Sequence, residues 1–310
     1  MKFERTYSVL PMRSRRELSA LAEKIFIEQG SMKRLGVRPD PLSRFIKEIG
    51  DRYRDNPYHN FQHAVDTLYT MAWLLNLPIF KKNLPDFHKY LLLMTALVHD
   101  VEHPGHDNQW EIKTHSPLAK KYNNMSVIEN HSLAVSKELL EDPELDVFAS
   151  IEEYKRQDIL KLFDQLILCT DFSWHKVFLD ELTEGTSRNK FDFKEKEFLS
   201  LMCRTLIKAA DISNTSKPFR QAKVWGQRVM NEFWAQGEME KKFNLPVGPL
   251  NDSSKSEFNS AQAGFIKFAA YELFALLSRV EEKSEEMVRA LQQNQIIYER
   301  NAERAAASLK

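Results

Sequence analysis

The sequence predicts an all-α protein, and three observations lead to that prediction. Apolar residues recur at spacings of three and four along most of the chain, for example over 147–166, and no convincing strand alternation competes with them. Glycine supplies only 9 of 310 residues, which argues against Gly-rich phosphate loops and turn-dense β architectures. No segment repeats with a period of roughly 20–50 residues, so we expect a compact multi-helix domain rather than a solenoid.

Helical periodicity predicts individual elements along the chain. Helices are expected over 16–29, 62–76, 87–98, 127–141, 196–209, 219–236 and 261–300, with Asp86 and Ser126 as caps. Loops rich in Pro, Gly, Asn and Ser are expected over 31–41, 77–86, 103–125, 182–192 and 243–260. None of these is a low-complexity linker, so one domain over 1–310 is expected, with an N-terminal helical region at 1–40.

The expected charged helix at 281–310 carries a thin apolar seam. The seam consists of Leu277, Val280, Met287 and Leu291. We interpret it as one edge of a helix packed within the chain, because heptad spacing is kept over too few turns for a coiled-coil arm.

Composition excludes several classes of protein. The chain has 44 Lys and Arg against 44 Asp and Glu, so charge gives no reason to expect nucleic acid or an anionic membrane as partner. The longest apolar stretch, 90–98, is far shorter than the ~20 residues a membrane-spanning helix needs, and it predicts a buried core helix instead. Two cysteines in apolar runs, Cys169 and Cys203, and an N-terminus without a signal-peptide pattern lead us to expect a cytoplasmic protein.

Histidines gather in two short windows. His59 and His63 are four residues apart, so their imidazoles share one face if a helix already begins at Tyr58. In the second window an apolar helix ends in His99 and Asp100, and a Pro-Gly pair then turns the chain. An ionised carboxylate buried there needs a counter-charge, and a divalent cation supplies one.

A third apolar helix presents another carboxylate, Asp211, directly after two alanines. The three segments together supply two imidazoles and two carboxylates, a set typical of zinc or another first-row metal: His63, His99, Asp100 and Asp211. Asp100 could bridge to a second, oxygen-preferring ion. Each residue alone is more often a core residue or a helix cap, but that alternative has to explain several buried carboxylates at once. The sequence therefore predicts a binuclear metal pocket between helices.

Further motifs follow one another in a recognisable order. They are YHNxxH at 58–63, HDxxHPGxxN at 99–108, SVIENH at 126–131, TD at 170–171, ADISN at 210–214 and QxGF at 262–265. This series resembles the catalytic domain of the class I 3′,5′-cyclic nucleotide phosphodiesterases, a branch of the HD-type metal phosphohydrolases. The chain departs from the family's common residues at Glu102, Thr215 and Ala222.

The resemblance implies specific chemical roles. The four metal ligands would hold Zn²⁺, with Asp100 reaching a second metal, Mg²⁺ or Mn²⁺, and a hydroxide bridging the two. A bound cation can lower the pKa of water from about 15.7 to about 7, which gives a nucleophile near neutral pH. His59 would be the general acid that protonates O3′, and His103 would lie near the bridging hydroxide.

The resemblance also assigns supporting and substrate-binding residues. The supporting set around the second metal is Asn108, Glu129, His131, Thr170 and Asp171. A capping box with Ser126 is the structural alternative for Glu129. The nucleotide pocket is expected to contain Gln262, Phe265, Val229, Asn214, Tyr58 and Phe233. Gln262 lies one turn from Phe265 and can donate to and accept from a purine edge, whereas ordinary core packing is the alternative for the apolar members.

The functional hypothesis is therefore a signal-transduction hydrolase that converts a 3′,5′-cyclic nucleotide to the nucleoside 5′-monophosphate. Asn214 matches several cAMP-preferring relatives, so cAMP is favoured and cGMP stays open. One alternative is an HD-type phosphohydrolase of noncyclic nucleotides, and another is a catalytically silent cyclic nucleotide sensor. We expect no nucleic acid partner and no membrane insertion. Homodimerisation and regulatory domains beyond this chain stay open.

Overall fold

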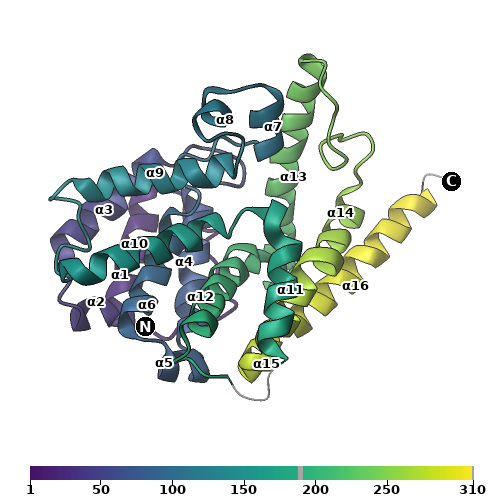
Figure 1. Cartoon of the computed structure of the whole chain (residues 1–310). Helices are drawn as coiled ribbons and strands as arrows, with labels where there is room; N and C mark the ends of the chain where they lie inside the picture. The colour runs from purple at the N-terminus through teal and green to yellow at the C-terminus, as the bar shows by residue number, and fades with distance from the viewer. Residues whose placement is uncertain (188–190, 309–310) are drawn as a thin grey trace.

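Helices make up the regular structure of residues 1–187 and 191–308, which the computed structural model describes (Figure 1). No strand occurs in these ranges, so the all-α prediction is confirmed. The α-helices of the first half are α1 (Arg15–Gln29), α2 (Ser31–Arg34), α3 (Pro39–Arg52), α4 (Phe61–Leu75), α5 (Pro78–Asn83), α6 (Asp86–Val98), α7 (Asn108–Lys113), α8 (Pro117–Lys121) and α9 (Val127–Glu141). The second half contains α10 (Glu153–Leu168), α11 (His175–Thr186), α12 (Lys196–Asp211), α13 (Phe219–Lys242), α14 (Phe258–Phe265), α15 (Tyr271–Val280) and α16 (Glu285–Ser308). Short 3₁₀ turns are η1 (Phe172–Trp174), η2 (Ile212–Ser216) and η4 (Glu282–Ser284), and η3 (Ile266–Ala270) is a π-helical turn.

Two buried helices, α4 and α6, form the centre of the fold. The side chain of Asn60 accepts the backbone N–H groups of Gln62 and His63 at 2.9 and 3.1 Å, which fixes where α4 begins. Residues 90–98 of α6 are buried throughout, which confirms the expected core helix. Helices α1 and α12 pack against α4. Across the part of the chain described, no helix combines the length and the apolar character that crossing a membrane requires.

The expected helix over 261–300 is wrong as one element, because the chain breaks at Glu281. This residue is extended, with φ −129° and ψ 100°, and α15 ends before it. Its carboxylate accepts the backbone N–H of Ile79 at 2.7 Å and that of Lys283 at 3.0 Å. A contact with the first turn of the distant helix α5 therefore stabilises the break. Beyond it, α16 packs along α14 and α15 (Figure 1), and the four seam residues are buried.

Three further expectations need correction. Several expected loops contain short helices, namely α2, α5, α7 and α8. A proline or a side-chain cap starts α5, α7 and α8 locally, as Ser116 does by accepting the N–H of Ala119 at 3.0 Å, whereas α2 has neither. Ser126 precedes α9 but does not cap it, because its backbone is left-handed with φ 40°. Part of the expected loop over 182–192 belongs to α11, and residues 188–190 lie outside the described ranges.

A buried ion pair supports α4 one turn after His63. Lys217 and Asp66 are both almost fully buried, and Lys217 Nζ lies 2.9 Å from Asp66 Oδ1. The same ammonium donates to the carbonyl oxygen of Tyr7 at 3.2 Å, and the Tyr7 ring stacks on Tyr69 of α4 at 4.1 Å. The pair thus joins the N-terminal segment and the start of α13 to the central helix.

We predict that Lys217→Met lowers the free energy of unfolding by about 3–5 kcal/mol, because Asp66 is left buried without its counter-charge. Urea denaturation followed by circular dichroism measures this. Lys223→Met, at an exposed position of α13, is the matched control and should change stability by no more than about 0.5 kcal/mol. Equal stability of the two variants would contradict a supporting role for the pair.

Candidate functional site

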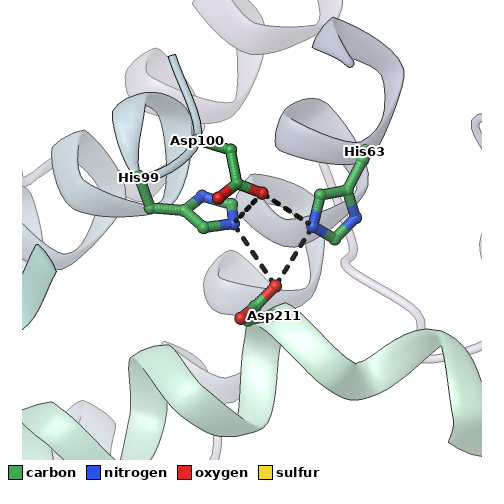
Figure 2. Close-up of side chains that lie close together, drawn as sticks. All are labelled: His63, His99, Asp100 and Asp211. Carbon is green, nitrogen blue, oxygen red and sulfur yellow. Dashed lines mark hydrogen bonds and ion pairs between the residues drawn. The ribbon is translucent and has the colours of Figure 1, made fainter. Parts of the chain in front are cut away.

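Four side chains from three helices meet at one point. His63 lies in the first turn of α4, His99 and Asp100 directly follow α6, and Asp211 ends α12. Figure 2 shows the two imidazoles facing each other, with one carboxylate on either side of the gap between them. His63 Nε2 lies 3.6 Å from Asp100 Oδ2 and 3.1 Å from Asp211 Oδ1. The corresponding distances from His99 Nε2 are 3.1 and 3.3 Å.

This arrangement fits a metal ion. Ligand atoms about 2.0–2.2 Å from a tetrahedral ion lie about 3.3–3.6 Å from one another, close to the observed spacings. The Nδ1 of His99 lies 3.1 Å from the carbonyl oxygen of Ala96, so it donates its proton there and leaves the lone pair of Nε2 to face the centre. The predicted ligand set is therefore brought together as a cluster of two nitrogens and two oxygens, all within 4.8 Å of one another.

The charges of this cluster depend strongly on one another. Burial alone would raise the pKa of Asp211, but His99 and His63 outweigh burial and hold that pKa well below its usual range. Burial likewise opposes the charged form of His99, whereas Asp100 and Asp211 raise its pKa well above the ordinary value. The carboxylates therefore stay ionised and demand positive charge between them, either as protons on the imidazoles or as a bound cation.

A second cluster, next to the first, contains His59, His103 and Glu232. The Nδ1 of His59 forms a short hydrogen bond with Glu232 Oε1, and the other carboxylate oxygen accepts the backbone N–H groups of Tyr58 and His59 at 2.9 and 3.1 Å. The rings of His59 and His103 stack with centroids 3.8 Å apart. The ring of His59 lies 6.1 Å from that of His63, a predicted metal ligand.

These contacts give the two stacked histidines different protonation states. Burial would lower the pKa of His59, but the charge and hydrogen bond of Glu232 raise it to about 9. Burial and the neighbouring charge of His59 lower the pKa of His103 to about 3, so His103 stays neutral. Its Nδ1 accepts the backbone N–H of Gly105 at 3.1 Å, so its own proton resides on Nε2. The structure thus provides one charged and one neutral imidazole side by side.

Sequence analysis missed Glu232, although a signal was present. On α13 it follows Trp225 by seven residues and precedes Gln236 by four, so it belongs to the buried stripe of that helix. A carboxylate in such a stripe needs a partner, and His59 is that partner. The side chain of Glu232 is 3% exposed and that of His59 is 21% exposed, so the imidazole is the part of the pair that is accessible from outside.

An asparagine outside the predicted site joins the segments that carry the two stacked histidines. Asn56 Nδ2 donates to the carbonyl oxygens of His59 and His103, at 2.9 and 2.8 Å. Gly105 follows with φ 86°, and a Cβ there would lie 2.8 Å from Asn56 Oδ1. Glycine is therefore needed at this position both for its backbone conformation and for the close approach of Asn56.

Three of the predicted supporting residues, Asn108, Glu129 and Asp171, interact with one another, whereas His131 and Thr170 have other partners. Asn108 Nδ2 donates to Glu129 Oε2 at 2.9 Å, and burial, with Asp171 nearby, raises the pKa of Glu129 to about 7. The hydroxyl of Ser126 donates to Asp171 Oδ2 at 2.6 Å instead of capping α9. His131 is placed elsewhere, with its Nε2 2.9 Å from Glu102 Oε2. The hydroxyl of Thr170 donates to the carbonyl oxygen of Ile167, three residues earlier in the chain, at 2.7 Å.

A buried lysine was also missed. Lys208 lies one turn before Asp211 on α12, and its Nζ donates to the carbonyl oxygen of Cys169 at 2.7 Å. Burial lowers its pKa. The bond joins the end of α10, just before Thr170 and Asp171, to the helix that ends in Asp211. A lysine inside the apolar run LIKAAD was the available signal.

The predicted nucleotide-binding residues lie on neighbouring elements. Gln262 of α14 is packed so closely on Gly226 of α13 that a Cβ on the glycine would lie 2.6 Å from Gln262 Oε1. The ring of Phe265 lies 5.6 Å from that of the exposed Phe172. Asn214 Nδ2 donates to the hydroxyl of Tyr58 through a short hydrogen bond. The other two predicted wall residues are half-buried: Val229 and Phe233.

Comparison with known proteins places this geometry in context. The chain matches the family described as 3′5′-cyclic nucleotide phosphodiesterase over residues 58–291. The high affinity cGMP-specific 3′,5′-cyclic phosphodiesterase 9A of Mus musculus is 32% identical over 287 residues, which are 91% of this chain and 53% of the relative. The 3′,5′-cyclic-AMP phosphodiesterase 4C of Rattus norvegicus is 29% identical over 301 residues, 94% of this chain and 56% of the relative. The chain therefore spans about half the length of these curated relatives.

Solved structures show the same fold. LmjPDEB1 in complex with IBMX superposes with a TM-score of 0.92 at 30% identity, covering 97% of this chain and 92% of that one. The phosphodiesterase domain of the RhoPDE fusion protein from Salpingoeca rosetta superposes with a TM-score of 0.93 at 26% identity, covering 98% and 96%.

The ligand cluster predicts how the protein responds to loss of one carboxylate. Asp211→Asn keeps the shape of the side chain but removes its charge, so the zinc bound per chain should fall from about one to below about 0.1. Elemental analysis after dialysis measures this. Asp158→Asn, at an exposed position of α10, is the control and should keep its zinc. An unchanged zinc content in Asp211→Asn would contradict the assigned centre.

The His59–Glu232 pair predicts a large shift in titration. In the metal-free chain, NMR of the imidazole protons should show His59 titrating near pH 9, and in Glu232→Gln at or below about 6.5. Because the folded-state pKa is raised, the stabilisation from protonated His59 is present below about pH 6.5 and lost as pH rises through about 9. Glu238→Gln, on the exposed face of the same helix, should leave the titration of His59 unchanged. If both variants titrate like the wild type, Glu232 does not control this imidazole.

Proposed function

The chain belongs to the 3′,5′-cyclic nucleotide phosphodiesterase family, and we propose that it hydrolyses a 3′,5′-cyclic nucleotide to the nucleoside 5′-monophosphate. The observation that carries the proposal is a protonated imidazole, His59, held beside a cluster of four metal ligands. Hydrolysis of the ring adds water to phosphorus and breaks the P–O3′ bond, and the departing oxygen needs a proton. The site contains a donor for that proton next to the place where metals would hold the phosphate.

The four ligands are proposed to hold Zn²⁺, and Asp100 is proposed to share a second ion, Mg²⁺ or Mn²⁺. Metals bound there supply Lewis acidity toward the phosphoryl oxygens and activate water as the nucleophile. Glu129, Asn108 and Asp171 are proposed to support the waters of the second ion, and their carboxylates and amide are of the oxygen-rich type that Mg²⁺ prefers. His131 and Thr170 stay predictions, because other partners use their hydrogen bonds.

His59 is proposed to act through Nε2. Glu232 occupies Nδ1 and fixes the orientation of the ring, so Nε2 is the nitrogen left to donate to O3′. The neutral His103 stacked on it adds no competing charge, and Asn56 holds both backbone segments in place. After the donation, the proton released by the attacking water restores the charge of the site.

The base is proposed to bind between Gln262 and Phe265, with cAMP as the favoured substrate. The amide nitrogen of Asn214 is used by Tyr58, which leaves its carbonyl oxygen as an acceptor that complements the amino group of adenine. Sequence identity does not separate the two substrates, because the relatives include a cGMP-specific enzyme at 32% and a cyclic-AMP enzyme at 29%. A cytoplasmic location stays a prediction of the sequence, and homodimerisation stays open.

The test is product formation from cAMP, cGMP and dGTP, assayed in parallel with zinc and magnesium supplied. We expect both cyclic nucleotides to yield 5′-monophosphates, cAMP with the higher kcat/KM. His59→Asn should lower kcat about 10²–10⁴-fold while keeping its zinc. The matched control is His115→Asn, which should keep full activity. His115 is exposed, and asparagine tolerates the left-handed backbone conformation at this position.

Each other outcome favours a different function. Faster turnover of dGTP than of either cyclic nucleotide would indicate a hydrolase of noncyclic nucleotides, which has no need of a proton donor for O3′. Binding of cyclic nucleotides without turnover would indicate a silent sensor. Full activity of His59→Asn would contradict the role of His59 alone.

A further inference from the structure

A cavity is lined by part of the segment that carries His59, although His59 itself is not among its lining residues. It has a volume of about 460 Å³ and is bounded by the residues that lead into α1, by the segment 55–62 and by α13. None of the four metal ligands lines it. Its volume is in the range of small-molecule sites, about 300–1,000 Å³.

The cavity collects positive charge in a chain whose formal net charge is zero. Three arginines line it, Arg13, Arg15 and Arg228, against one carboxylate, Asp55. Arg15 is fully engaged, because it donates to Asp55 at 2.8 Å and to the carbonyl oxygens of Tyr53 and Gly50. Among the residues that the structure describes, no carboxylate pairs with the guanidinium groups of Arg13 and Arg228.

The guanidinium groups of Arg13 and Arg228 have different surroundings, but a bound anion would stabilise both. Within residues 1–187 and 191–308, no ion pair or hydrogen bond involves the exposed guanidinium of Arg13. Arg228 donates to the amide oxygen of Gln62 at 2.5 Å and lies 4.9 Å from the ring of Trp225. Burial lowers the pKa of Arg228, and the like charge of Arg13 acts in the same direction. An anion between the two would relieve both effects.

Amide groups at the rim add neutral donors. The Oδ1 of Asn231 accepts from Gln227 at 2.9 Å, so its amide nitrogen is left to donate. Guanidinium groups bind phosphate oxygens through paired N–H donors, whereas a carboxylate ligand would use fewer of the donors present.

We propose that this cavity is a second, non-catalytic binding site for a phosphomonoester, with Arg13 and Arg228 as its anion-binding residues. The site is independent of the proposed hydrolytic activity. Its floor includes Asn56, which holds the carbonyl oxygens of His59 and His103, so an occupant contacts the segment that positions the proton donor. The ligand is an organic phosphate or inorganic phosphate, since both present the same dianion.

Isothermal titration of the full chain tests the proposal, with inorganic phosphate and a nucleoside 5′-monophosphate as separate probes at constant ionic strength set with chloride. The metal centre would also bind these probes, so the measurement uses Asp211→Asn, which removes that centre and should still show one binding event. Arg13→Gln should weaken this event at least about tenfold, as expected for loss of a charged hydrogen-bond donor. Arg16→Gln, at an exposed position of α1 outside the cavity lining, should leave it unchanged.

Arg13 makes the decisive variant, because its side chain is exposed and its removal breaks no hydrogen bond or ion pair among the described residues. Arg228→Gln is a second variant that should weaken the same event. Tighter binding of the monophosphate than of inorganic phosphate would support an organic ligand, and equal binding would support free phosphate. Unchanged affinity in Arg13→Gln, or loss of all phosphate binding in Asp211→Asn, would overturn the proposal.

Discussion

Two carboxylates at the ends of buried helices, Asp100 and Asp211, impose the main physical constraint on this structure. Charge is expensive to bury, and a carboxylate in such a place must find positive charge or take up a proton. Here α4, α6 and α12 converge so that two imidazoles face both carboxylates, and the pKa of each carboxyl stays below its usual range. The packing of these three helices therefore also determines the electrostatics of the site.

In the neighbouring cluster of His59, His103 and Glu232, one imidazole is kept charged and the other neutral. Glu232 supplies a buried negative charge to His59, and the resulting positive charge helps to keep His103 deprotonated. Because Glu232 belongs to α13 and the histidines to the first third of the chain, this charged imidazole exists only when both parts have folded together. The same contact brings α13, which also carries Gly226 against Gln262, next to the ligand cluster.

Much of this arrangement could be predicted from the sequence, because its signals are local. A polar pair such as His99 and Asp100 at the end of an apolar helix has few structural explanations, and the helical period is strong enough to place most elements. The predictions that proved wrong depend on contacts between residues that lie far apart in the sequence. The break at Glu281 depends on the backbone of Ile79, and Ser126 looks like a cap until its hydroxyl is seen on Asp171. Glu232 was visible as a carboxylate in a buried stripe, but its partner lies 173 residues away.

The central claim is that two imidazoles and two carboxylates bind one zinc ion, and X-ray absorption spectroscopy at the zinc edge tests it most directly. For protein loaded with one equivalent of zinc, we predict a first shell of nitrogen and oxygen at about 2.0–2.2 Å, with the outer scattering of two imidazole rings. A sulfur shell near about 2.3 Å, or a spectrum without imidazole scattering, would place the metal elsewhere and contradict the account.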